Sequence, residues 1–231
     1  MKFGYAVVFL VMIMACQDNG EEGELDPIRL GYEFFPLQVG AYIIYDVEEI
    51  TYSSESSITT NYQLRTQVVD SFMNQAGSLT YVLHELRRDS PDDAWEFVQT
   101  NSLQRNETQG VFFDGNVPFL RLSFPVVAGK TWDGNALNAE PEDLYEMDSL
   151  FSAYITPSGQ NIPETLTVIQ EDNDDFTVNL IRRFEIYGQD IGLVYKEEID
   201  LRYCTEQECI GQQIIESGQE LRQSLLEYGQ E

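Results

Sequence analysis

Hydrophobic and polar residues alternate with a period of two along much of this chain. In the clearest run, from Ile191 to Tyr203, apolar side chains recur at every second position and only Glu197 interrupts them. The residues between them are mostly polar, so the segment predicts a long strand with one face on a core and the other in water. A second run alternates in the same way from Tyr62 to Val68.

Further strand candidates are short apolar or alternating segments at residues 41–52, 79–88, 94–100, 118–124, 165–170 and 178–187. The breaks between strands are rich in Asn, Asp, Gly, Ser or Pro, at residues 74–77, 90–93, 114–116, 133–135 and 171–174. Many strands at this spacing predict a mainly β protein. We expect a single antiparallel β domain, an open half-barrel or a sandwich, with little helix.

Two segments are ambiguous between helix and strand. Residues 141–154 begin with Pro141, which suits the first turn of a helix, but a strand from Tyr145 onward is equally compatible with the pattern. In the tail, Leu221 and Leu225 fit either period. Because the chain around it is β, we expect residues 216–228 to form a final edge strand.

The chain begins with Lys2 and an apolar run of about twelve residues from Phe3 to Met14. A membrane-spanning helix needs roughly 20 apolar residues, so this run fits a signal peptide, here residues 1–15. Its end, Ile13-Met14-Ala15-Cys16, resembles the lipobox of bacterial lipoproteins. The resemblance implies that Cys16 becomes the first residue of the mature chain and carries lipid, with a membrane as its partner through this anchor.

Residues 16–33 are acidic and rich in Gly, and large apolar side chains are nearly absent before Ile28. Such a segment buries too little surface to fold, so we expect a flexible acidic tether, followed by the β domain at 34–231. The start of the tether is similar to export signals of surface lipoproteins in the Bacteroidetes, and a plain linker explains it about as well. The expected location is the bacterial outer membrane, on its periplasmic face or at the cell surface.

The charge balance excludes one class of partner. The chain has 40 acidic and 13 basic residues and a net charge of −27. Such a surface repels phosphate backbones, so nucleic-acid binding is not expected.

With Cys16 assigned to lipid, Cys204 and Cys209 remain, and an exported protein can keep a disulfide between them at the base of a hairpin loop. A metal site is the alternative, but two thiols and one histidine supply few soft ligands.

Motifs for catalysis are weak. His84 is the single histidine, shares a strand face with Val82 and Leu86, and is expected beside a core. No G-x-S-x-G motif occurs, and Gly129-Lys130-Thr131 lacks the first glycine of a phosphate loop. Acidic pairs such as those in glycoside hydrolases are expected by chance in so acidic a chain. The run 172–175 superficially suggests calcium ligands, although Phe176 stands where a ligand belongs. We therefore expect no cofactor, no metal and no catalysis.

Trp95, Phe97 and Trp132 are candidates for aromatic residues that contact a ligand, although aromatic residues of β proteins are more often core.

Four segments carry a resemblance over most of the mature chain: FFPLQVGAYIIYDV at 34–47, LSFPVVAGKTWDGNALN at 122–138, YGQDIGLVYKEE at 187–198 and SGQELRQSLLEYG at 217–229. In this order they look like a group of uncharacterised Bacteroidetes envelope lipoproteins, and loosely like half-barrels that hold apolar cargo. The group brings no established activity. We expect a binding or interaction module for an apolar or glycan ligand or a partner protein. The alternatives are an envelope enzyme with paired carboxylates and a structural partner of an outer-membrane complex.

Overall fold

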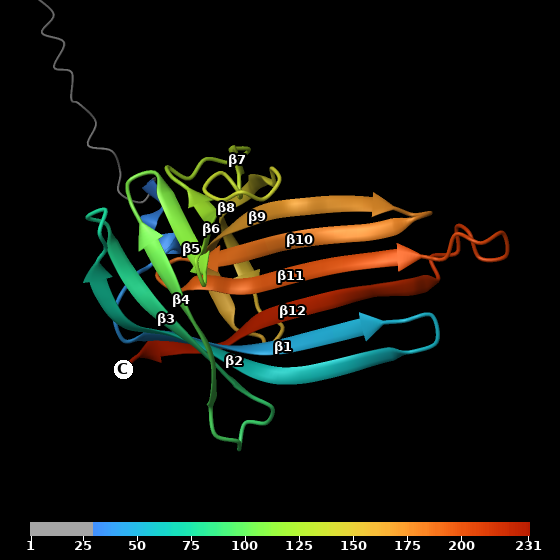
Figure 1. Cartoon of the computed structure of the whole chain (residues 1–231), viewed down its shortest axis with the longest axis horizontal. Helices are drawn as coiled ribbons and strands as arrows, with labels where there is room; N and C mark the ends of the chain where they lie inside the picture. The colour runs from blue at the N-terminus through green and yellow to red at the C-terminus, as the bar shows by residue number, and fades with distance from the viewer. Residues whose placement is uncertain (1–29) are drawn as a thin grey trace, which may run out of the picture.

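Twelve strands follow one another through residues 30–231, the part of the chain that this computed structural model describes, and one 3-10 turn precedes them (Figure 1). The elements are η1 (Tyr32–Phe34), β1 (Ala41–Tyr52), β2 (Ser57–Met73), β3 (Leu79–Arg88), β4 (Glu96–Arg105), β5 (Gln109–Asp114), β6 (Val117–Ser123), β7 (Thr131–Asp133), β8 (Leu144–Ile155), β9 (Asn161–Asp175), β10 (Asn179–Gly188), β11 (Gly192–Tyr203) and β12 (Ile215–Gln230).

The strands form one antiparallel sheet in the order β6-β5-β4-β3-β2-β1-β12-β11-β10-β9-β8-β7. Neighbours in sequence pair throughout, except β6 and β7, and the last strand returns to pair with the first. The prediction of an edge strand at the C-terminus was therefore wrong. β12 lies in the middle of the sheet because its two sides are paired with β1 and β11 over most of its length.

The two edge strands, β6 and β7, approach each other and nearly close the sheet into a barrel. The Leu120 amide donates to the Gly134 carbonyl over 2.8 Å, and the Trp132 indole nitrogen donates to the Leu120 carbonyl over 3.0 Å. These contacts satisfy edge groups that would otherwise be open to pairing with another chain. The predicted class, mainly β in a single antiparallel domain with little helix, is confirmed.

Two of the predicted strands agree with the structure in both bounds. The bounds of β1 and β3 are those expected, and Asn74 forms the predicted turn, its side-chain oxygen accepting from the amides of Ala76 and Ser78. The ambiguous segment 141–154 is largely strand, as β8. Its Phe151 has a φ of 54° between irregular pairings with β9, which explains the poor periodicity.

The turn expected at 171–174 was wrong, because β9 continues to Asp175. Two acidic residues of this stretch are directly opposite arginines of β10. Asp172 lies 3.5 Å from Arg182, and Glu171 lies 3.4 Å from Arg183. Opposite charges on directly paired residues stabilise a sheet, so an acidic run that is typical of a turn becomes part of a strand.

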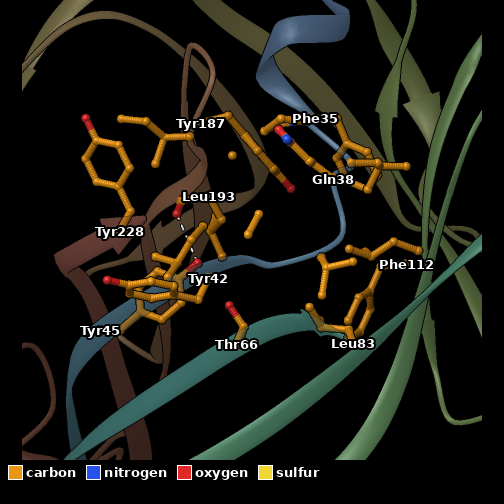
Figure 2. Close-up of a pocket in the computed structure, with 18 of the residues that line it drawn as sticks. Phe35, Gln38, Tyr42, Tyr45, Thr66, Leu83, Phe112, Tyr187, Leu193 and Tyr228 are labelled. Atoms are coloured by element: carbon orange, nitrogen blue, oxygen red, sulfur yellow. Dashed lines mark hydrogen bonds between the residues drawn. The ribbon is translucent and has the colours of Figure 1, made fainter. Parts of the chain in front are cut away.

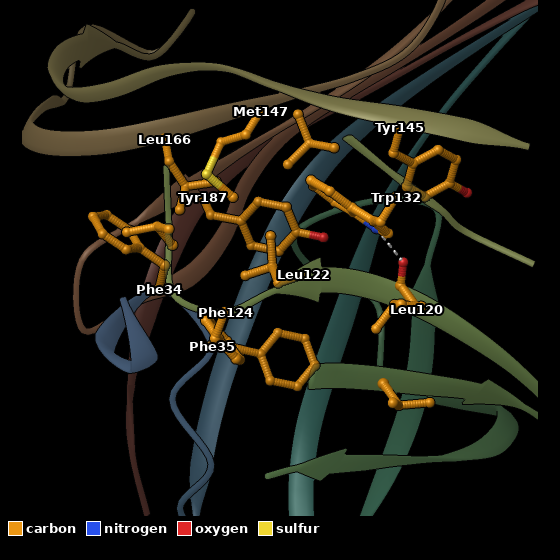
Figure 3. Packing of buried hydrophobic residues seen from close by; sticks show 13 residues of the cluster. Phe34, Phe35, Leu120, Leu122, Phe124, Trp132, Tyr145, Met147, Leu166 and Tyr187 are labelled. Carbon is orange, nitrogen blue, oxygen red and sulfur yellow. Dashed lines mark hydrogen bonds between the residues drawn. The ribbon is translucent and has the colours of Figure 1, made fainter. Parts of the chain in front are cut away.

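The main core lies near the closing seam (Figure 3). Leu122, Met147, Leu166 and Val168 are completely buried there, together with Phe34 from η1. Full burial of each such side chain contributes roughly 1.5–3 kcal/mol before entropy is counted. The core therefore ties the N-terminal turn to strands from both ends of the sheet.

The folded part begins earlier than residue 34. Tyr32 places its ring edge-on against Phe124 at 5.1 Å, and its hydroxyl donates to the Glu107 carbonyl. Gly31 has a φ of 79°, and a Cβ there would lie 2.2 Å from the Val126 side chain. Residues 30–33, expected to end the tether, are thus packed against the domain.

Candidate functional site

A cavity of about 470 Å³ lies between the segment that follows η1 and the strands on either side of the β1–β12 pair (Figure 2). This volume falls within the range of about 300–1,000 Å³ that is usual for small-molecule sites. Much of the wall is apolar, with Leu83, Leu103, Phe112, Ile43 and Leu193 among its residues. The cavity could therefore bury the apolar body of a small ligand.

The register of the strands explains which side chains reach the cavity. Glu185, Lys196 and Gln223 lie directly opposite one another on β10, β11 and β12. Residues paired in this way point to the same face of a sheet, and all three line the cavity. In the same way Thr66 on β2 faces Glu85 on β3.

The inner end of the cavity holds a buried ion pair. The Arg121 guanidinium lies 3.2 Å from Glu185, whose side chain is 3% exposed. The Tyr187 hydroxyl donates to the other oxygen of the same carboxylate. Arg121 also lies 5.5 Å from the ring centres of Phe112 and Phe119, close enough for cation–π attraction. We call Arg121, Glu185 and Tyr187 the inner cluster.

The electrostatics of the inner cluster fix its protonation. Burial by itself would raise the pKa of Glu185, but the positive charges of Arg121 and Lys196 outweigh burial and hold that pKa below its usual range. Burial and the neighbouring Glu185 carboxylate raise the pKa of Tyr187 well above its ordinary value. At neutral pH the cluster is therefore an ionised carboxylate, an arginine cation and a neutral phenol.

A second carboxylate, Glu85, also lines the cavity. One of its oxygens accepts from the Asn101 side chain over 2.8 Å and the other from Gln99 over 2.9 Å. Nearby, the Tyr45 hydroxyl donates to the Leu193 carbonyl over 3.0 Å, and burial raises the pKa of this tyrosine. These polar groups are thus already hydrogen-bonded within the protein.

The opposite end of the cavity is its mouth, where lining residues are exposed to solvent. Gln38, Asp190, Tyr228 and Gln230 lie there. Three of these four side chains are uncharged hydrogen-bonding groups. The site therefore combines a polar mouth, largely apolar walls and a charge-paired inner end.

Beyond the inner cluster lies a separate polar hollow of about 410 Å³, and Arg121 lines both spaces. Its main ion pair joins Arg183 to both oxygens of Asp143, over 2.8 and 3.0 Å. Glu198 lines this hollow too and lies 2.8 Å from the Lys196 ammonium. Charged groups at the boundary of the two spaces are thereby paired with one another.

The aromatic residues that the sequence suggested do not line the cavity. Trp132 is buried in the main core, and its indole NH is bonded to Leu120. Trp95 lies under the Arg88 guanidinium at 4.3 Å. Phe97 is 59% exposed and has its ring edge-on to His84. The His84 and Leu83 side chains point to opposite faces of β3, so the histidine points away from the cavity residues of that strand.

The structure joins Cys204 and Cys209 by a disulfide, with 5.8 Å between their Cα atoms. We expected the two cysteines to face each other at the base of a hairpin loop, and the structure does not place them so. Cys204 is bonded through its amide to the Ile214 carbonyl, and Cys209 lies within the turns of the long β11–β12 connection. This connection lies at the far end of the long strands from the C-terminus (Figure 1).

Two other sequence motifs have structural roles. The Lys130 ammonium donates to the carbonyls of Phe124 and Pro125, and burial lowers its pKa. Within residues 30–231, no group of three or more His, Cys, Asp or Glu side chains is placed to hold a metal ion. Asp172, from the suggested calcium run, is paired with Arg182 instead.

Cys16 and the predicted signal peptide lie outside the described residues. In the part of the chain that is described, no helix is both long and apolar enough to cross a membrane.

Sequence reasoning missed the charged residues of the cavity. One signal was present: Arg121 stands between Leu120 and Leu122 in an otherwise apolar strand. A charge in such a strand suggests a buried partner. The partner, Glu185, lies 64 residues away on β10, and the pattern of residues along the chain gives no means of finding it.

Comparison with known proteins finds two solved structures that resemble this one. No family model and no curated protein sequence matches the chain. A protein of Bacteroides fragilis described as exported, with a YmcC-like fold, is 12% identical with a TM-score of 0.46, over 84% of this chain and 98% of the other. A protein of Parabacteroides distasonis described as a lipoprotein is 11% identical with a TM-score of 0.45, over 85% and 98%. At this sequence identity, the similarity concerns the structure alone.

Proposed function

We propose that this protein is a lipid-anchored envelope protein that binds a ligand with an apolar body in the cavity between the segment that follows η1 and the strands on either side of the β1–β12 pair. The observation that carries the proposal is the cavity of about 470 Å³ with largely apolar walls and a mouth of exposed polar residues. Transfer of apolar surface from water into such a space is favourable by about 25 cal/mol for each Å² buried.

The proposal is one of binding without catalysis. Two carboxylates that line the cavity are hydrogen-bonded within the protein: Glu85 to two amides, and Glu185 to Tyr187 and, as an ion pair, to Arg121. A glycosidase acid needs a raised pKa, whereas the pKa of Glu185 is lowered. This arrangement supports a static charge pair in preference to a pair of reacting groups.

The test is a titration with N-phenyl-1-naphthylamine, an uncharged dye whose fluorescence rises in apolar surroundings. The full chain carries Cys16→Ser, so that no attached acyl chain competes for the cavity. We expect saturable binding at one site. An absence of saturable enhancement with the folded protein would contradict the proposal.

A matched pair of variants locates the dye. Leu83 lines the cavity, so Leu83→Trp fills part of it and should abolish or strongly weaken binding. Leu79, on the same strand and 43% exposed, does not line the cavity, so Leu79→Trp should leave binding unchanged. Equal binding by the two folded variants would show that the dye sits elsewhere.

A further inference from the structure

We propose that the ligand of this cavity is an uncharged amphiphile, an apolar chain with a hydroxyl or amide head, and that the cavity discriminates against amphiphiles with an anionic head. This inference rests on the proposed binding function and names the class of ligand. Its basis is the pairing of both cations that line the cavity with carboxylates of the protein.

The two cations that line the cavity are already neutralised. Arg121 lies 3.2 Å from Glu185, and Lys196 lies 2.8 Å from Glu198. An anionic head that entered would have to displace one of these carboxylates or remain buried without a counter-charge. A buried charge without a partner is strongly unfavourable, so a carboxylate or phosphate head is disfavoured.

The two carboxylates differ in their partners. Glu185 is paired with the Arg121 cation and bonded to Tyr187, whereas Glu85 is bonded only to the neutral amides of Gln99 and Asn101. Glu85 therefore keeps its negative charge beside the cavity, which adds to the repulsion of an anionic head. The fifth charged lining residue, Asp190, is exposed at the mouth, where water screens its charge.

The remaining polar groups of the lining suit an uncharged head. Thr66 and Gln223 line the deeper part, and Gln38, Tyr228 and Gln230 lie at the mouth. Hydroxyl and amide side chains both donate and accept hydrogen bonds, as do hydroxyl and amide groups of a ligand. The net charge of −27 adds a general repulsion of anions.

The test compares three amphiphiles with the same dodecyl-type chain: monolaurin, which is neutral, laurate and dodecyltrimethylammonium. Each displaces N-phenyl-1-naphthylamine from the Cys16→Ser chain below its micelle-forming concentration. We expect monolaurin to displace the dye at a concentration about tenfold or more below that of laurate, because only the laurate carboxylate is buried without a counter-charge. Dodecyltrimethylammonium, which the unneutralised Glu85 does not repel, should also displace the dye better than laurate.

The outcomes separate the two proposals. If the dye binds and laurate displaces it as well as monolaurin or the ammonium compound does, the inference about charge is overturned and the binding function stands. If the dye binds in the cavity and none of the three amphiphiles displaces it, the proposal that the ligand is an amphiphile is overturned. If the dye itself does not bind, the proposed function fails first.

A gain of binding tests the reason for the discrimination. Glu198→Gln releases the Lys196 ammonium, which lines the cavity, and Glu198 is exposed enough (38%) for the change to be tolerated. We expect displacement by laurate to improve about tenfold while displacement by monolaurin is unchanged. Asp200→Asn, on the same strand but outside the cavity lining, is the control for the change in net charge. No improvement in Glu198→Gln, or an equal one in the control, would overturn the explanation.

Discussion

Replacing Glu185 by Gln removes a carboxylate that is 3% exposed and leaves the Arg121 guanidinium without its counter-charge. Breaking a buried ion pair from one side costs about 3–5 kcal/mol of unfolding free energy, because the remaining charge keeps its desolvation penalty. The Arg121 side chain is 18% exposed and lies near two aromatic rings, so the loss should fall near the lower end of that range.

The reverse change, Arg121→Met, should have a cost of the same order, because it leaves the Glu185 carboxylate buried. The double variant Arg121→Met/Glu185→Gln retains no charge and should be more stable than either single variant. Asp89→Asn is the control. It breaks an ion pair of 2.9 Å whose side chains are 38% and 75% exposed, so a change within about 0.5 kcal/mol is expected.

The dependence on pH adds a second readout. The pKa of Glu185 is lowered in the folded protein, so its contribution to stability is present above the pKa of the unfolded chain, about 4.3, and is lost as pH falls through the folded value. In Arg121→Met the cation that opposes burial is gone, and burial should raise the pKa of Glu185. The stability of that variant, relative to the native chain, should then rise as pH falls.

The assay is urea unfolding followed by tryptophan fluorescence between about pH 3 and pH 8, with unfolding free energies from linear extrapolation. Two results would refute the reasoning. One is a loss in Glu185→Gln no larger than that in Asp89→Asn. The other is an identical pH dependence in Arg121→Met and the native chain.

Three further changes test other parts of the molecule. Replacing Cys204 and Cys209 by Ser opens a short covalent loop and should cost about 2 kcal/mol in urea unfolding; the native chain with a reducing agent should show the same shift, and an unchanged midpoint would contradict it. Trp132→Phe leaves the buried Leu120 carbonyl without its donor, which should cost about 1–3 kcal/mol by the same measurement; a loss near zero would show that the seam does not depend on this bond. Cys16→Ala should abolish labelling with radioactive palmitate, and unchanged labelling would exclude the lipid anchor.

The pattern of apolar and polar side chains was sufficient to predict many of the strands. β1 and β3 have the expected bounds because both segments are rich in apolar, β-branched and aromatic residues. It failed at 171–174, where Glu171 and Asp172 are paired with arginines of the next strand. It also failed for the tail, because pairing between β1 and β12 joins residues nearly the whole chain apart.

The candidate site was less predictable than the fold. The aromatic residues Trp95 and Phe97 stood out in the sequence but lie outside the cavity, and Trp132 belongs to the core. The residues that define the site are a charge within an apolar strand, Arg121, and its distant partner Glu185. Neither can be assigned without knowing which strands face each other.

By itself the sequence determined the secondary structure class, the acidic surface and the single pair of cysteines left in the folded part, because these follow from composition and from local periodicity. Only the tertiary structure decided where β12 lies, how β6 and β7 close the sheet, and which charges meet at the inner end of the cavity. The physical reason is that a strand fixes the direction of its side chains locally, whereas the partner that each side chain meets depends on register between distant strands. The cavity and its charge pairing are products of that register.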